Sequence, residues 1–361
     1  MRINLVCLFL ILMFYFSFVQ ASEDIQAQFD LEMNTYHSNL EQNKWFEAAE
    51  AVTRAYELGN QLYKNDVAKL SELTLLTGIA RNKAHLNQVE PFLNAARAYY
   101  EKVSGAERQL VQVYVELAKY QRSLSPKRKK ETLELLDNAI TVSKKDPLMR
   151  AEVEHEKGEM LRSYDLHSAS AGHTHFKNTY KLLLEINAQK THLFAKTAYR
   201  LGKIEASRYK LARAESYYLE SLESYQSLTQ DDELEAQTTT VRMMLVRLYE
   251  AQRESEKSTP YLLEIGRYMT RFSKANPTLV YQSVFRAPKY QHRALDVGEF
   301  ELLVDVDEEG YVRNPRLLRS RGDDRHDIKV IGALRKYRYA PVFKDGMPQY
   351  SKDIKVRFKV L

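Results

Sequence analysis

Four histidines that lie close together in the sequence are the residues best suited to chemistry. They are His155, His167, His173 and His175, with Glu152, Glu154 and Glu156 nearby. His173 and His175 could share a metal ion in an extended stretch, whereas a helix would point them apart. The sequence has no matching His pair at the i, i+4 spacing of a helical metal site. This segment is therefore interpreted as a solvated loop between helices, with a weak metal site or a hydrolase site as the alternatives.

Other charged clusters have structural explanations. Asp231-Asp232 and Asp323-Asp324 are interpreted as helix starts, because Asp there accepts backbone N–H bonds and complements the positive helix end. A catalytic carboxylate pair is the alternative. The basic run 127–130 follows Pro126 and is interpreted as a solvated first helical turn, with an anionic partner as the alternative.

The sequence lacks the motifs of several enzyme classes. The sequence contains no Gly-rich phosphate loop, no G-x-S-x-G nucleophile elbow and no metalloprotease helix motif. Cys7 is the one cysteine and lies in an N-terminal apolar run. If that run is removed, disulfides, Cys-zinc sites and cysteine nucleophiles are all excluded. The sequence thus predicts a protein that is not an enzyme, with no cofactor and no metal.

Composition favours a helix-rich folded chain. The 361 residues are 44% hydrophobic and 28% charged, with 12 Gly and 9 Pro. These values are ordinary for a folded protein, and scarce Gly and Pro favour helices over a sheet sandwich. The net charge is +6, of which +4 falls from Pro288 onward. This excess is modest and no base-stacking motif accompanies it, so nucleic acid is not the expected partner.

The N-terminus has the pattern of a secretory signal. Arg2 precedes an apolar run from Leu5 to Phe16, and Val19 and Ala21 suit cleavage before Ser22. The run is short for a membrane span. Residues 1–21 are therefore predicted to be a signal peptide, which implies a periplasmic protein. The alternative is an uncleaved anchor in the inner membrane, and only then would the chain contact a membrane.

From residue 22 to residue 274 the pattern is that of paired helices. Apolar residues recur at three- and four-residue spacing, which indicates helices that bury one face. The second helix of each pair begins near residues 45, 88, 129, 172, 210 and 258, a period of about 40 residues that is typical of helical-hairpin solenoids. Thr259-Pro260 is expected to open the last helix.

One stretch shows the repeat most clearly. In 198–225, the small residues Gly202 and Ala214 stand where two helices of a hairpin would touch, and larger residues surround them. This stretch resembles the tetratricopeptide repeat, and Trp45 to Tyr56 shows a similar pattern of small and aromatic residues. Such arrays expose a concave surface. The resemblance implies that a protein or peptide binds there.

The last segment has the pattern of a small α+β unit. Phe300, Leu302, Val304 and Val306 alternate along one predicted strand, and a second strand from Tyr311 to Ser320 follows. A helix is then expected with an apolar face, before a last strand, Ile354–Val360, in which apolar and cationic residues alternate. The residues expected on the apolar face of that helix are Ile328, Ile331, Leu334 and Tyr337. The fold class is thus mostly α, a helical-hairpin solenoid followed by a ββαβ unit.

In order and spacing, this segment resembles the C-terminal domain of the TonB family. The matching residues include Ala287-Pro288-Lys289-Tyr290, Val304-Asp305-Val306-Asp307, Gly310-Tyr311-Val312, Tyr337-Arg338-Tyr339-Ala340-Pro341, Gly346-Met347-Pro348 and Val356-Arg357-Phe358. Gln291 departs from the family pattern, which has proline there. The resemblance covers the last fifth of the chain. Together with the signal pattern and the helical repeats, it gives four predicted regions: 1–21 signal peptide, 22–274 repeats, 275–287 linker or extended lead-in, and 288–361 TonB-like domain.

The resemblance implies a docking mode. A partner segment would pair with the free edge of the final strand, taking affinity from main-chain hydrogen bonds. Lys355, Arg357 and Lys359 would favour an acidic peptide, although lysines on an edge strand also prevent aggregation. The implied contact residues are Tyr290, Ile354, Lys355, Val356, Arg357, Phe358 and Lys359.

Two functions follow from this resemblance. The first is a periplasmic adaptor whose partners are an outer-membrane transporter or other proteins of the TonB system. The chain has no Pro-rich spacer, so it is not expected to be the energy transducer itself. The second is a structural or assembly scaffold of the cell envelope, in which the C-terminal domain would form a homodimer or bind the cell wall.

Overall fold

The computed structural model describes residues 5–168, 170–229, 231–272, 275–283, 298–321 and 325–360. Of these, the side chains of 5–22, 298, 321, 325–327, 329 and 358–360 are not described. The chain divides into two compact units, Met1–Ile186 and Asn187–Leu361. This division falls inside the helical region, whereas the sequence pattern suggests a boundary near residue 274.

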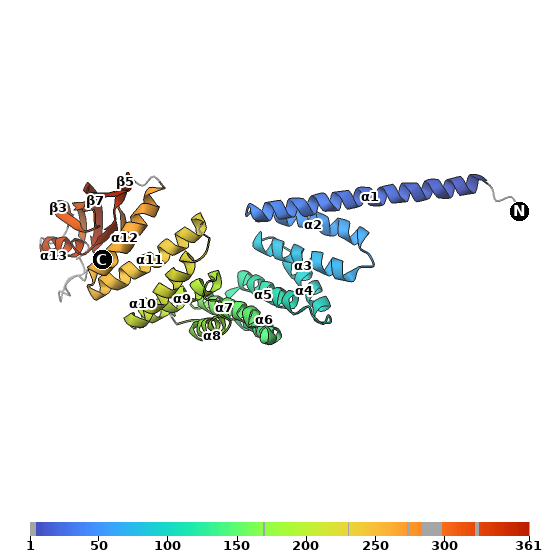
Figure 1. The fold of residues 1–361 in the computed structure, drawn as a ribbon, viewed down its shortest axis with the longest axis horizontal. Helices are drawn as coiled ribbons and strands as arrows, with labels where there is room; N and C mark the ends of the chain where they lie inside the picture. The colour runs from blue at the N-terminus through green and yellow to red at the C-terminus, as the bar shows by residue number, and fades with distance from the viewer. Residues whose placement is uncertain are drawn as a thin grey trace. The chain divides into compact units, whose positions relative to one another are not determined.

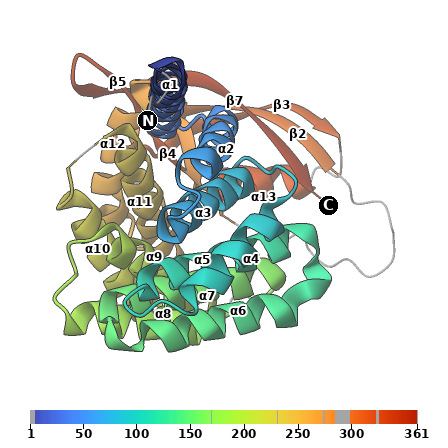
Figure 2. The same ribbon diagram turned by 90° about the vertical axis from the view of Figure 1, so that its right-hand side faces the viewer.

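The first unit consists of antiparallel helical hairpins in which the two helices lie side by side (Figures 1 and 2). Small residues allow this close approach: a Cβ on Gly78 would stand 2.6 Å from Leu93, and one on Gly158 would stand 2.7 Å from Phe176. Short 3₁₀ turns, Pro126–Arg128 and Ser143–Lys145, precede α6 and α7. The helices are α1 (Leu5–Glu41), α2 (Trp45–Leu62), α3 (Val67–Lys83), α4 (Val89–Tyr100), α5 (Glu107–Leu124), α6 (Lys129–Val142), α7 (Pro147–Tyr164) and α8 (His173–Glu185).

The predicted signal segment coincides with the first part of α1. The helix runs without interruption from Leu5 to Glu41, past the expected cleavage position before Ser22. Residues 1–4 and the side chains of 5–22 lie outside the described part of the chain. Among the residues that are described, no helix is both long and apolar enough to cross a membrane.

In the described part of the second unit, the helices α9 to α12 are followed by the small β-rich region, which contains α13. Helices α9 and α10 form a hairpin, as do α11 and α12, and the expected starts of all second helices agree with the structure to within a few residues. The elements are α9 (His192–Ser207), α10 (Leu211–Gln226), α11 (Asp232–Gln252), α12 (Ser255–Thr270), β1 (Thr278–Tyr281), β2 (Gly298–Val306), β3 (Val312–Arg321), α13 (Arg325–Leu334), β4 (Arg338–Ala340), β5 (Val342–Lys344), β6 (Met347–Gln349) and β7 (Ser351–Val360).

The β-rich region has a three-stranded antiparallel sheet at its centre. Its strand order is β3–β2–β7, and α13 lies between β3 and β7 in the sequence, which confirms the predicted ββαβ order. Two further pairs, β1–β4 and β5–β6, are also antiparallel. Figure 2 shows β2, β3 and β7 side by side. The fold class predicted from the sequence is therefore confirmed.

The core of this region follows the predicted alternation, with one exception. All four apolar residues of β2 (Phe300, Leu302, Val304 and Val306) are buried, as are Leu334 and Tyr337. The side chain of Ile328 is 79% exposed, so its predicted place on the buried face of α13 was wrong. Val330 occupies the core instead. Val330 and Leu334 are four residues apart and so lie on one face of α13, whereas Tyr337 is buried beyond the end of the helix at Leu334.

Two predicted boundaries also differ from the structure. Part of the segment expected to be a linker, Thr278–Tyr281, forms strand β1 and pairs with β4. Helix α12 begins at Ser255, one turn before Thr259-Pro260, so Pro260 lies inside the helix. The Ser258 and Thr259 hydroxyls donate to the Ser255 carbonyl, which holds this turn in place although Pro260 has no N–H to donate.

Candidate functional site

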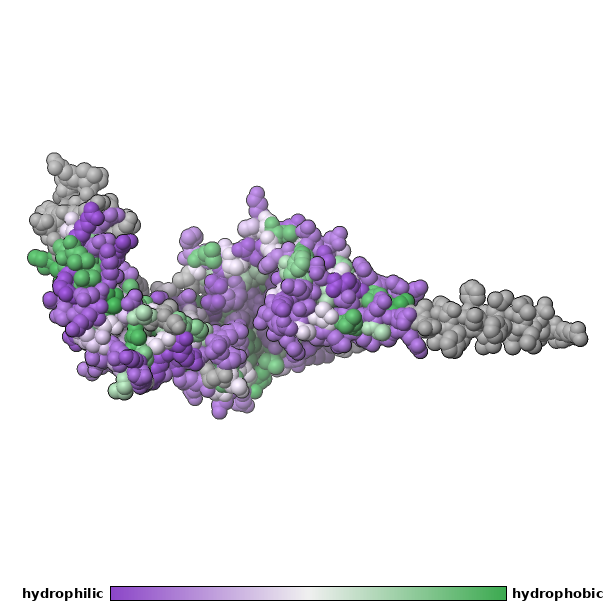
Figure 3. Space-filling view, turned by 90° about the horizontal axis from the view of Figure 1, so that it is seen from above, coloured by the Kyte–Doolittle hydropathy of each residue, from purple (hydrophilic) through white to green (hydrophobic). Residues whose placement is uncertain are grey.

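Hydropathy alone does not mark a binding site. On the face of the molecule drawn in Figure 3, hydrophilic side chains predominate and hydrophobic ones gather in small patches. Backbone geometry and charge instead indicate two candidate sites. One is the edge of β7, and the other is the buried contact that holds the β-rich region on α11 and α12.

Strand β7 lies at an edge of the three-stranded sheet. It pairs with β2 along nearly its whole length, from Ser351 opposite Val306 to Val360 opposite Gly298. Among the residues that the structure describes, no strand pairs with the other side of β7. Its outer N–H and C=O groups are therefore placed to accept another strand. The resemblance to the TonB C-terminal domain implies docking at this edge.

The two faces of β7 differ as expected. Ile354 and Val356 pack against the sheet core, while Lys355 and Arg357 are on the exposed face. Glu301 of β2 lies between these two cations, with a carboxylate oxygen 3.3 Å from Lys355 Nζ and another 3.1 Å from Arg357 Nε. The hydrogen bond from Lys355 lowers the pKa of Glu301. The preference for an acidic peptide expected from these cations is thus reduced by an internal carboxylate.

The remaining predicted contact residues cannot be placed in full. The backbone of Phe358 and Lys359 belongs to β7, but their side chains lie outside the described residues. Tyr290 and the Asp323-Asp324 pair are also outside them. Asp231 does cap α11, since its side chain accepts a bond from Leu234 N at 2.7 Å.

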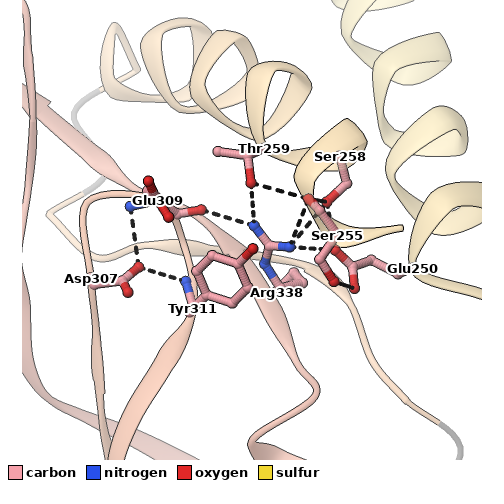
Figure 4. A network of polar contacts seen from close by, with 8 residues as sticks. All are labelled: Glu250, Ser255, Ser258, Thr259, Asp307, Glu309, Tyr311 and Arg338. Carbon is pink, nitrogen blue, oxygen red and sulfur yellow. Dashed lines mark hydrogen bonds and ion pairs between the residues drawn. The ribbon is translucent and has the colours of Figure 1, made fainter. Parts of the chain in front are cut away.

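A buried arginine joins the β-rich region to the last helical hairpin (Figure 4). Arg338 of β4 is 1% exposed and forms an ion pair with Glu250 of α11, which is 6% exposed. Its guanidinium nitrogens also donate to Ser258 Oγ at 3.0 Å and to Thr259 Oγ1 at 2.9 Å, both on α12. Most of the cation's hydrogen-bonding capacity is thus used, which offsets the cost of removing its charge from water.

The same arginine also fixes the β2–β3 turn. Its guanidinium donates to the Glu309 carbonyl at 3.0 Å and lies 3.7 Å from the centre of the Tyr311 ring. Tyr311 also forms an isolated bridge with Arg338, and Gly310 is left-handed with its Cα facing the Tyr339 carbonyl. A side chain at this position would collide with that carbonyl. The turn, β4 and the two helices therefore meet at one charged centre.

Close backbone packing continues the junction along α12. A Cβ on Gly266 would stand 2.4 Å from the Pro341 carbonyl, and Phe343 N donates to Thr270 Oγ1 at 3.0 Å. Beside this contact, Leu262 and Ile265 are fully buried in one apolar cluster. The cluster also contains Val246, Val280 and Ala340. We refer to the residues of this cluster together with Arg338, Glu250 and Gly266 as the junction.

The junction was not predicted from the sequence. Arg338 belongs to the motif that resembles the TonB domain, but no partner was expected for it. The signal was present, because a lone cation stands among apolar and aromatic residues in 337–341. A charge in such a strand needs a buried counter-charge. Nothing in the local sequence indicates that Glu250, far earlier in the chain, supplies it.

The histidine cluster is a packing feature rather than a solvated loop. His155 lies in α7, is 7% exposed and has its ring 5.4 Å from that of Phe176. His175 in α8 has its Nδ1 2.7 Å from Oε2 of the buried Glu154. The loop interpretation was therefore wrong for these two residues, since both face the contact between α7 and α8. Among the described residues, no group of three or more His, Cys, Asp or Glu side chains could hold a metal ion.

Comparisons with known proteins define the fold of the helical part. No protein-family model matches the chain, and no curated protein matches its sequence. The structure is similar to that of BtubC (BKLC) from P. vanneervenii, with a TM-score of 0.53 at 15% identity over 69% of this chain and 98% of that one. It is also similar to aspartyl phosphate phosphatase F from Bacillus subtilis, with a TM-score of 0.54 at 12% identity over 73% and 70% of the two chains.

These similarities are of fold. They support a helical-hairpin array as the class of this protein. Within that class, the array is tetratricopeptide-like: Gly202 stands against the Tyr218 ring, where a Cβ would approach it to 2.6 Å, as the repeat pattern in 198–225 predicts.

Proposed function

We propose that this protein is a non-enzymatic periplasmic adaptor. Its tetratricopeptide-like array binds a protein partner, and its β-rich region accepts a strand from an outer-membrane transporter or another TonB-system protein along β7. The open outer edge of β7 is the single observation that carries this proposal. The ββαβ order and the residues that resemble the TonB C-terminal domain support it.

Backbone pairing can be tested separately from side-chain binding. The probe is a peptide with the sequence of a transporter's periplasmic N-terminal segment, made in two forms that are N-methylated at alternate residues. In strand addition only one alternate set of N–H groups faces β7. One methylated form should lose binding and the other should keep it, with amide NMR shifts centred on 351–357. Equal binding by both forms, or shifts confined to the helices, would contradict docking on β7.

A cell-envelope scaffold is the second candidate function. The observation that favours it is that β3, like β7, has one side without a pairing strand among the described residues. Two copies of the chain could therefore pair edge to edge. Molar mass measured over a range of concentrations distinguishes the two functions. A dimer that the transporter peptide does not dissociate favours the scaffold, and a monomer that binds the peptide favours the adaptor.

A further inference from the structure

Two neighbouring loops in the first unit carry exposed leucines. Leu124 is the last residue of α5 and is 48% exposed, and Leu166 follows the end of α7 by two residues and is 75% exposed. Both therefore lie at the tips of helical hairpins, on the surface of the array. Exposed apolar side chains with polar residues around them often mark a contact with a protein or a membrane.

The two loops are held together by side chains of α5, α6 and α7. Arg122 Nε donates to Ser163 Oγ at 3.0 Å, and Arg122 Nη2 donates to the Ser163 carbonyl at 2.8 Å. Tyr164 Oη donates to Thr132 Oγ1 at 2.9 Å. The Arg122 guanidinium and the Lys129 ammonium lie 4.6 Å and 5.9 Å from the centre of the Tyr164 ring. The loops therefore form one joined surface rather than two independent tips.

This joined surface is rich in cations that have no counter-charge. Residues 122–130 contain five cations and no acidic residue. Two of the cations are held by the serine and the tyrosine named above, and Arg128 donates to the uncharged side chain of Gln121. Among the described residues, Lys130 alone of the five forms an ion pair, with Glu134 at 3.9 Å. Most of this positive charge is therefore not neutralised within the protein.

Acidic residues close to the cations lie on another side of α6. Glu131 and Glu134, with Glu90 of α4, line a cavity of about 330 Å³ between α4, α5 and α6. At about 100° per residue, positions 131 and 134 are turned by roughly 140–200° from Lys129, which faces α7. In the second loop, Asp165 accepts a backbone N–H of its own turn at 3.0 Å. Positive charge is therefore in excess where the two loops meet.

We infer that the surface formed by Leu124, Leu166 and the cations of 122–130, which we call the basic tip, docks on a bilayer that contains anionic lipids. The cations meet the lipid phosphates, and the two leucines enter the boundary between head groups and acyl chains. An acidic protein segment or a nucleic acid supplies negative charge but no continuous apolar layer for the leucines. The contact involves neither β7 nor the N-terminal apolar run, so it goes beyond the proposed function and does not depend on it.

The probe is a vesicle of phosphatidylcholine and phosphatidylglycerol with brominated acyl chains, which quench tryptophan fluorescence at close range. Leu166→Trp places a reporter in the basic tip, and Val67→Trp places one at the start of α3, at a position that is 58% exposed. Using the full chain, we expect stronger quenching at 166 than at 67, after subtraction of the signal from Trp45, the one tryptophan of the unchanged chain. Vesicles of phosphatidylcholine alone should quench position 166 less.

The N-terminal apolar run is present in every variant, so a tether formed by it cannot produce a difference between the two positions. Equal quenching at 166 and 67 would overturn the inference, because the basic tip would then not enter the bilayer. Circular dichroism confirms that each variant is folded.

The role of charge is tested in the Leu166→Trp chain. Lys127→Gln combined with Lys129→Gln should weaken docking on the phosphatidylglycerol vesicles, read from a quenching titration, by about tenfold or more. Lys144→Gln combined with Lys145→Gln removes the same charge beyond the other end of α6 and should change it by less than about twofold. A similar loss in both pairs would contradict docking by the basic tip. So would tighter binding of polyglutamate or single-stranded DNA than of vesicles at the same concentration of negative charge.

Discussion

Arg338 places a full positive charge where water cannot reach it. Its counter-charge, Glu250, is also buried, and both are held by hydrogen bonds from different elements. Such a pair adds little stability compared with an apolar pair of the same size, but breaking it leaves one charge without compensation. The geometry of the junction therefore depends on both residues being present.

We expect Arg338→Ala to lower the free energy of unfolding of the second unit by about 3–5 kcal/mol, because Glu250 would remain buried and unpaired. Urea unfolding followed by circular dichroism measures this loss. Arg267→Ala is the matched control, since it removes an exposed ion pair with Glu264 and should cost less than about 1 kcal/mol. Similar losses in the two variants would show that the buried pair has no special role.

A substitution of Tyr209 is expected to raise the free energy of unfolding instead of lowering it. It turns the chain between α9 and α10 with a φ of 57° and is 89% exposed, so its ring gains little from packing. A left-handed conformation costs a residue with a Cβ roughly 1–2 kcal/mol, and the extra freedom of glycine in the unfolded chain returns part of that.

Tyr209→Gly should therefore raise the free energy of unfolding by about 0.5–1 kcal/mol, measured by urea denaturation. Tyr209→Ala removes the ring but keeps the Cβ, and it should leave stability unchanged. A gain with alanine as large as that with glycine would mean that the ring, and not the backbone, is the source of strain.

At the scale of elements, β2 and β7 are held together by charges as well as by their ladder. Hydrogen bonds from Lys355 to Glu301, and from Asn314 and the Asp353 N–H to Asp305, lower the pKa of both carboxyls. A carboxyl with a lowered pKa stabilises the fold above its ordinary pKa of about 4. That contribution is lost as the pH falls through the lowered value.

We therefore expect the amide protons of β7 to exchange faster relative to those of α10 as the pH is lowered from neutral to below about 4. Hydrogen exchange followed by mass spectrometry measures the difference after correction for intrinsic rates. Glu301→Gln should remove part of this acid sensitivity while leaving the fold intact. An unchanged pH profile in that variant would exclude Glu301 as its source.

The packing of α12 on β4 and β5 depends on one glycine. Gly266→Ala would bring its Cβ against the Pro341 carbonyl, so β4 and β5 should exchange their amide protons faster than in the unchanged protein. Gly332→Ala is the control, because a Cβ at this position of α13 would meet nothing within 4 Å apart from its chain neighbours and the backbone of its own helix. It should stabilise its helix by up to about 1 kcal/mol. Equal effects of the two changes would show that the close contact is unimportant.

Local sequence signals predicted the elements well and their long-range contacts poorly. Periodicity and small residues such as Gly202 located the hairpins, and alternation located β2 and β7, because these depend on near neighbours. The Arg338–Glu250 pair, the pairing of β1 with β4 and the burial of His155 depend on residues distant in sequence. The exposed cations of β7 were predicted. Their pairing with Glu301 could not be, because it depends on the register of β2 against β7.

At the scale of the whole molecule, the β-rich region closes the end of the second unit. A solenoid needs a terminal element that covers its last apolar face. Here Val280, Ala340 and Phe343 cover the side of α12 that carries Leu262 and Ile265. The sequence pattern alone presents the β-rich region as an independent domain. Its removal would instead uncover an apolar face of α12.

A chain ending at Phe272 should expose this face of α12 and self-associate. Light scattering after size exclusion measures the expected rise in molar mass. Adding Leu262→Lys and Ile265→Lys to the shortened chain makes the same face polar and should restore a monomer. A monomeric shortened chain without these changes would show that α12 needs no cover. Point changes in β7 therefore test docking on this strand more cleanly than removal of the whole β-rich region would.

The junction also constrains how such a protein can evolve. Arrays of helical hairpins change length readily by duplication or loss of a repeat, since each repeat contacts its neighbours in the same way. The hairpin of α11 and α12 is different, because Glu250, Ser258, Thr259 and Gly266 are each matched to one feature of the β-rich region. Repeats can be gained or lost before α11 without disturbing these matches. The last hairpin and the β-rich region must be inherited together.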